Sequence, residues 1–192
     1  MTFFKTRPKT GIKIFGVLLL GLIFSFQNRE KINYQTIKVA DMLSVKVPVE
    51  FQKLNDDQIA DKVITPRKPL VMYSSPNGTA DFSVSTGNSA RNPWNDNDLK
   101  MMAQFQKSNI QQLFTSVSFI QEKMVKVNGQ QFAMFEFVSE LKEKGKPTIR
   151  KYNHVRYTIR RKNTLIFSFI CPEVDRPIYD GMAEEIMASV KF

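Results

Sequence analysis

The chain has 192 residues, of which 42% are hydrophobic and 24% are charged. This length suits one domain with a sizeable core, and the balance excludes an intrinsically disordered chain. The 28 lysines and arginines against 18 aspartates and glutamates give a net charge of +10, and the one cysteine excludes an internal disulfide framework and a multi-cysteine zinc site.

Residues 1–27 have the pattern of an export segment. An uncharged apolar run over 14–26 follows four basic residues: Lys5, Arg7, Lys9 and Lys13. A positive region before such a run is typical of a signal peptide, and the run is short for a transmembrane span. No cleavage motif follows, so a signal peptide and a retained N-terminal membrane anchor both remain open. Either one predicts export across the cytoplasmic membrane, with the protein periplasmic or anchored with its domain outside the cytoplasm.

A linker over 28–33 is expected to lead into one domain over 34–192. Alternating apolar residues predict strands over 34–39 and 43–47, and Pro48 ends the second because it cannot donate a ladder hydrogen bond. The run Asn55-Asp56-Asp57 predicts the cap of a short helix. Strands are then expected over 70–74 and 80–85, joined by a turn at Asn77-Gly78.

A polar loop over 87–97 precedes a long helix that begins near Asp98. Its inward stripe is predicted to hold Leu99, Met102, Ala103, Ile110, Leu113, Phe114 and Val117. Four strands follow, over 119–127, 130–140, 150–161 and 164–171. Asp175 is expected to cap a last helix whose inward face holds Ile178, Met182, Ile186 and Val190. This order predicts an α+β fold with a largely antiparallel β-sheet and helices on both faces.

In the order of its motifs, the chain resembles the PsbP/Mog1/DcrB-like superfamily over residues 34–192. The features that match are two hairpins, ending at Leu43-Ser44-Val45-Lys46-Val47-Pro48 and Ser85-Thr86-Gly87, the long helix, the Val127-Asn128-Gly129 turn, and the closing Ala188-Ser189-Val190-Lys191-Phe192. The resemblance implies an α/β/α sandwich and a protein that binds or supports other proteins and is not an enzyme. It implies no catalytic residues, and nothing in the sequence matches the photosynthetic or Ran-binding members specifically.

The residues themselves predict no catalytic site, cofactor or metal. Hydrolase, Walker and Rossmann motifs are absent. The one histidine and the one cysteine, His154 and Cys171, are expected on neighbouring strands, but Cys171 precedes Pro172 with no nearby positive charge to lower its pKa. Asn55-Asp56-Asp57 and Asp96-Asn97-Asp98 lack the spacing of a calcium loop and read as helix caps.

Two groups of residues are candidate binding surfaces. Strand alternation places a basic group on one face, predicted to contact an anionic surface or a partner: Arg150, Tyr152, His154, Arg156 and Arg160. The alternative is a solvated strand face whose basic residues protect a sheet edge. An apolar group lies outside the helix stripe and in the loop before it, and is a candidate partner patch if exposed: Trp94, Met101 and Phe105.

Together these observations predict a non-enzymatic envelope protein, exported or membrane-anchored, that binds or supports a protein assembly. A protein partner and membrane association through the N-terminal segment are expected, and nucleic acid binding is not, since no such motif is present. The alternative is a small-ligand or lipid-binding envelope domain with a pocket among the strand phenylalanines: Phe132, Phe135, Phe137, Phe167 and Phe169.

Overall fold

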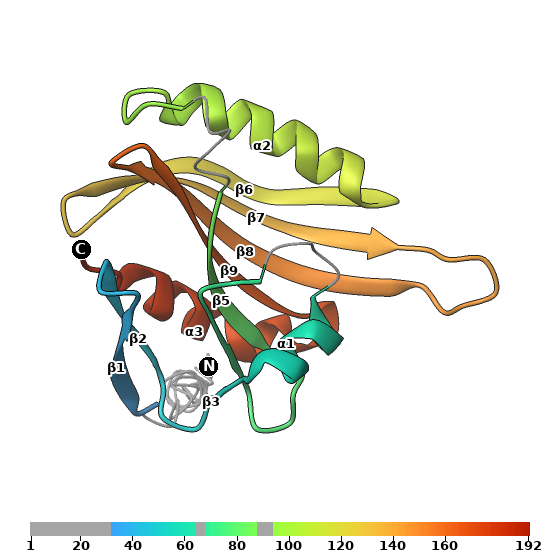
Figure 1. Cartoon of the computed structure of the whole chain (residues 1–192). Coiled ribbons are helices and arrows are strands. Elements are labelled where there is room, and N and C mark those ends of the chain that lie inside the picture. Colours follow the sequence, from blue (N-terminus) through green and yellow to red (C-terminus); the bar gives the residue numbers. More distant parts are fainter. Residues whose placement is uncertain (1–31, 64–67, 88–93) are drawn as a thin grey trace, which may run out of the picture. The chain divides into compact units, whose positions relative to one another are not determined.

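The computed structural model describes residues 32–63, 68–87 and 94–192 (Figure 1). Residues Asn33–Phe192 form one compact unit. The predicted export segment over 1–27 lies outside the described residues, as does most of the linker. No helix in the described part of the chain has the length and apolar character to cross a membrane.

The first predicted hairpin is confirmed, and it forms a sheet of its own. Strand β1 (Tyr34–Val39) pairs antiparallel with β2 (Leu43–Pro48) in a separate two-stranded sheet. Ala40 and Asp41 adopt positive φ angles of 46° and 51° in the turn, which fits the tight turns that join hairpin strands. The backbone of β2 also bonds to the C-terminus, because the N–H of Ser44 donates to Lys191 at 2.8 Å.

The predicted cap at Asn55 is also confirmed. The Asn55 side chain accepts from the N–H of Gln58 at 2.9 Å, and the Gln58 side chain accepts from the N–H of Asn55 at 2.9 Å, which completes a capping box. This cap begins α1 (Asp56–Lys62). A two-residue strand just before it, β3 (Gln52–Lys53), was not predicted because two residues carry no periodicity.

The main sheet has seven strands in the order β3-β4-β5-β9-β8-β7-β6, and every pair is antiparallel. The strands after β3 are β4 (Val71–Ser74), β5 (Asp81–Thr86), β6 (Ser116–Val127), β7 (Gln130–Leu141), β8 (Ile149–Arg160) and β9 (Asn163–Pro172). The last four form the predicted meander, so consecutive strands lie side by side. Strand β9 then pairs with β5, which joins the meander to the second hairpin.

Helices cover both faces of this sheet, as predicted (Figure 1). Helix α2 (Leu99–Leu113) packs on β6, β7 and β8, where Met102 and Ile110 meet the buried side chains of Phe135 and Tyr157. A short 3-10 turn, η2 (Glu173–Asp175), leads into α3 (Arg176–Ala188), which packs on β8, β9 and β2. The domain is therefore an α+β sandwich with two apolar layers.

Three details of the predicted helix faces are wrong. The stripe predicted for the long helix is too long, because α2 ends at Leu113 and Val117 lies in β6. Leu113 is exposed at the end of α2, and Ile178 is 69% exposed on α3. The buried residues of α3 are Tyr179, Met182, Ala183, Ile186 and Met187. The predicted inward face of α3 begins one residue too early, at Ile178 instead of Tyr179, because both residues are apolar enough to begin it.

Candidate functional site

The most unusual polar group of the described residues lies under α3. His154 and Arg156 project from β8 towards the helix, with side chains only 1% and 2% exposed. Glu136 stands opposite His154 on β7, and Glu184 reaches down from α3 with its side chain 56% exposed. Charged groups are rarely buried unless they are paired. These four residues are therefore the candidate site, called the α3 clamp below.

Arg156 organises the clamp through two hydrogen bonds. Its Nη2 donates to Oε2 of Glu184 at 2.5 Å, and its Nε donates to Nε2 of His154 at 3.2 Å. The His154 Nε2 atom is thus an acceptor, which places the proton of the neutral ring on Nδ1. That Nδ1 is buried without a hydrogen-bond partner among the described residues, and Oε1 of Glu136 lies 3.8 Å away.

The environment keeps His154 neutral. Burial lowers the pKa of His154 to about 3, and the positive charges of Arg156 and Lys123 act in the same direction. Both effects penalise the imidazolium form. At neutral pH His154 is therefore a neutral acceptor for Arg156, and the guanidinium is paired with the carboxylate of Glu184.

The clamp does not fit a metal site in this arrangement. Glu136, His154 and Glu184 each offer one ligand atom within 4.8 Å of the others. However, Nε2 of His154 and the carboxylate of Glu184 already accept from Arg156, and Nδ1 carries the ring proton. A divalent cation would also have to sit beside a buried guanidinium, which repels it. The geometry instead ties β8 to α3.

The predicted basic surface is not formed, because α3 covers most of it. Strand alternation correctly placed Tyr152, His154 and Arg156 on one face, but all three are buried. Arg150 at one end is exposed and holds Glu173 through two hydrogen bonds of 2.5 and 3.1 Å. Arg160 at the other end lies 4.5 Å from the centroid of the Phe192 ring. Tyr152, His154 and Arg156 are therefore not part of a binding surface, and the alternative of a solvated strand at a sheet edge is also wrong, because β8 lies between β9 and β7.

Two residues of the predicted apolar group, Met101 and Phe105, lie on α2, and Trp94 lies in the segment before it. Met101 and Phe105 are 60% and 51% exposed. The Trp94 and Phe105 rings lie 5.9 Å apart between centroids, tilted by 53°, and Trp94 also packs on the core under the helix. We call Trp94, Met101 and Phe105 the α2 patch. Its role in binding stays a prediction.

Cys171 and His154 do not form a catalytic pair. In the β8–β9 register Cys171 stands opposite Tyr152, whereas His154 stands opposite Phe169. Burial raises the pKa of the Cys171 thiol to about 12, with nearby Asp175 and Asp180 adding to the shift. A thiolate nucleophile is therefore disfavoured at neutral pH.

The strand phenylalanines belong to two separate layers. Phe132, Phe167 and Phe169 lie on the α3 face, with the first two rings 5.8 Å apart between centroids. Phe135 and Phe137 lie on the opposite face with α2. Because the sheet separates the two groups, all five cannot line one ligand pocket.

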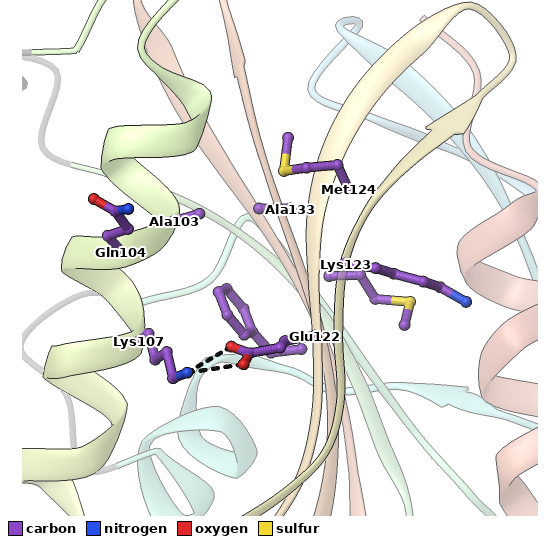
Figure 2. A pocket seen from close by; sticks show the side chains of 9 residues that line it. Ala103, Gln104, Lys107, Glu122, Lys123, Met124 and Ala133 are labelled. Atoms are coloured by element: carbon purple, nitrogen blue, oxygen red, sulfur yellow. Dashed lines mark hydrogen bonds and ion pairs between the residues drawn. The ribbon is translucent and has the colours of Figure 1, made fainter.

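A shallow groove that the sequence did not reveal runs between α2 and β6 (Figure 2). Its volume is about 200 Å³, and Ala103, Gln104 and Lys107 of α2 line one wall. Glu122 and Met124 of β6 stand on the other side. The position of Glu136 opposite His154 was also missed, because it depends on the register between β7 and β8, which the long loop between these strands does not fix.

Comparison of the sequence with family models and with curated proteins finds no match. The fold, however, is shared with solved structures. Cyanobacterial PsbP (CyanoP) of Synechocystis superposes with a TM-score of 0.55 and 12% identity, covering 89% of this chain and 99% of its own. The Ran-binding protein Mog1p of Saccharomyces cerevisiae gives 0.55 and 13%, covering 84% and 96%. LpqN of Mycobacterium tuberculosis gives 0.53 and 10%, covering 83% and 90%. The chain therefore has the PsbP/Mog1-like fold.

Proposed function

We propose that this chain, built on the PsbP/Mog1-like fold, is a non-enzymatic envelope protein that binds another protein through the α2 patch. The observation that carries the proposal is the exposure of Met101 and Phe105 on α2, where the Phe105 ring packs against Trp94 of the preceding segment. Aromatic and methionine side chains are enriched at protein interfaces, and exposed apolar groups of this kind mark binding surfaces.

The absence of catalytic pairing among the described residues supports a non-enzymatic role. His154 is a neutral acceptor for Arg156, and Cys171 is a buried thiol. The groove beside α2 is about 200 Å³, smaller than the roughly 300–1,000 Å³ of ordinary small-ligand pockets. We therefore favour a protein partner over the lipid or small-ligand alternative.

The envelope location is proposed from the sequence of residues 1–27, with its basic start and apolar run. Two proteins of the same fold are compatible with this proposal: LpqN is involved in cell envelope biogenesis, and Mog1p binds Ran. These two proteins support the proposal of an envelope protein that binds a partner, and neither identifies that partner.

Crosslinking and affinity capture of the full chain from its native membranes test this proposal. We expect one reproducible partner, retained by Ile178→Asp and lost in Phe105→Asp. Ile178 is a matched control because it is an exposed apolar residue of α3, away from the α2 patch. Capture of the chain alone, soluble and cleaved near Gln27, would overturn the anchored protein-binding role.

A further inference from the structure

Strand β6 leaves one side of the main sheet open. It is the last strand in the sheet order, and among the described residues it pairs only with β7. Its register with β7 is interrupted between Phe119 and Gln121 and then runs without a break over 121–127. The outer edge of such a strand presents unpaired backbone N–H and C=O groups, which can pair with another chain. Residues 121–127 are thus a seven-residue template for an added strand.

The groove lies directly beside this open edge (Figure 2). Met124 of β6 is 38% exposed at its margin, and Ala133 and Phe135 of β7 line it further in. Lys107 of α2 and Glu122 of β6 form an ion pair of 2.8 Å across it. A helix beside a free strand edge can hold an extended peptide, because the edge bonds the peptide backbone and the groove takes alternate side chains.

The charge around the edge selects an acidic occupant. Lys100 of α2 and both Lys123 and Lys126 of β6 are exposed. Only Glu122 is negative on the 121–127 stretch, and Lys107 already neutralises it. A second copy of this chain is disfavoured as the occupant, since each copy carries a net charge of +10. Lysines on an edge also deter pairing between copies, which keeps the edge available for an oppositely charged segment.

We propose that the β6 edge binds an extended, acidic segment of a partner protein as an eighth strand, with alternate apolar side chains against Met124 and the groove. This inference rests on the proposed protein-binding function and adds a second surface to it. The two surfaces are on opposite flanks of α2, because Phe105 and Lys107 are two residues apart and hence about 200° around the helix.

Peptide binding to the full chain in uncharged detergent tests the inference. The probe is a labelled eight-residue peptide in which valine alternates with aspartate, measured by fluorescence anisotropy and by hydrogen exchange of the protein. We expect saturable binding that slows amide exchange over 121–127 about tenfold. Raising the salt from about 0.05 M to about 0.5 M should weaken binding, because screening removes the attraction to the lysines.

Variants then locate the site. Met124→Asp and Lys126→Glu should each weaken binding about tenfold, equivalent to about 1.4 kcal/mol, whereas Ile178→Asp should leave it unchanged. Lys126→Glu changes only an exposed charge, so it still tests the site if Met124→Asp alters folding. A peptide whose backbone amides are N-methylated should not bind, since it cannot donate to the edge.

Three outcomes would overturn the inference: no binding of the probe, equal binding of the N-methylated peptide, or protection of 121–127 by a dimer without peptide. If these occur while Phe105→Asp still abolishes partner capture, the proposed function stands and only the β6 edge is excluded. If the probe binds but no partner is captured from membranes, the β6 edge stands and the proposed function fails.

Discussion

Because the chain has a single histidine, His154, the pH dependence of its stability near neutral pH can be predicted from that one residue. In the folded protein the pKa of His154 is lowered to about 3, whereas in an unfolded chain a histidine titrates near 6.5. As the pH falls below about 6.5, the unfolded state gains a proton that the folded state does not accept, so the folded state loses relative stability. This contribution is fully present above about pH 6.5 and is lost progressively towards pH 3.

The magnitude follows from proton linkage. Each pH unit below the unfolded pKa costs about 1.4 kcal/mol, so moving from pH 7.5 to pH 5 should lower the free energy of unfolding by about 2 kcal/mol. The measurement is urea unfolding of the full chain in uncharged detergent, followed by the fluorescence of Trp94, the only tryptophan. Stopping at pH 5 limits the contribution of carboxylates, whose ordinary pKa values are near 4.

His154→Gln is the matched variant, because glutamine can still accept a hydrogen bond from Arg156 but does not titrate. We expect its free energy of unfolding to change by less than about 0.5 kcal/mol over the same pH range, the usual size of a minor effect. An equal loss in the variant and the wild type would refute the reasoning, since the slope would then come from other groups. A flat profile in the wild type would mean that the folded protein protonates His154, with Glu136 moving in to pair with it.

Three further predictions concern stability, each measured by the same unfolding assay. Glu184→Gln should lower the free energy of unfolding by about 2 kcal/mol, because it leaves the buried Arg156 guanidinium without its carboxylate while solvent reaches part of the gap. In a double variant with Arg156→Met, part of that stability should be regained. Additive losses in the double variant would contradict the ion-pair interpretation. Asn55→Ala should lower the free energy of unfolding by about 1 kcal/mol, because it removes the cap of α1. An unchanged free energy of unfolding would contradict this, since water would then replace the cap fully. Gly129→Ala should cost about 1 kcal/mol, since Gly129 has a φ of +90° that alanine adopts poorly; Gly129→Asn should cost less.

The meander was predictable because its signals are local. Asn128-Gly129 fixed one turn, and apolar residues on both faces of 130–140 indicated a strand covered on both sides. The same alternation placed Tyr152, His154 and Arg156 on a common face, but it could not say what covers that face. Polar side chains therefore suggested solvent, whereas the covering element, α3, begins only at Arg176, beyond the following strand β9. Glu184 carries no sequence signal for Arg156, since the pair depends on how α3 is placed.

The two faces of the sheet differ in a way that bears on where binding occurs. On the α3 side the Arg156–Glu184 ion pair joins strand to helix, and the side chain of Asn128 donates to the carbonyl of Val190 at 2.7 Å. These contacts link the β6–β7 turn, β8 and the C-terminal segment, so that changes there should lower stability.

On the α2 side the exposed apolar side chains and the free edge of β6 carry few such links, so substitutions there can be tolerated by the fold. Variants of the exposed residues Met101 and Phe105 and of the β6 edge should therefore lose binding while keeping the free energy of unfolding, and variants of the α3 clamp should do the reverse. This separation follows because the ion pair of the α3 side includes the buried Arg156, whereas both side chains of the Lys107–Glu122 ion pair on the α2 side are exposed. A variant of Arg156 that kept full stability but lost the partner would contradict it.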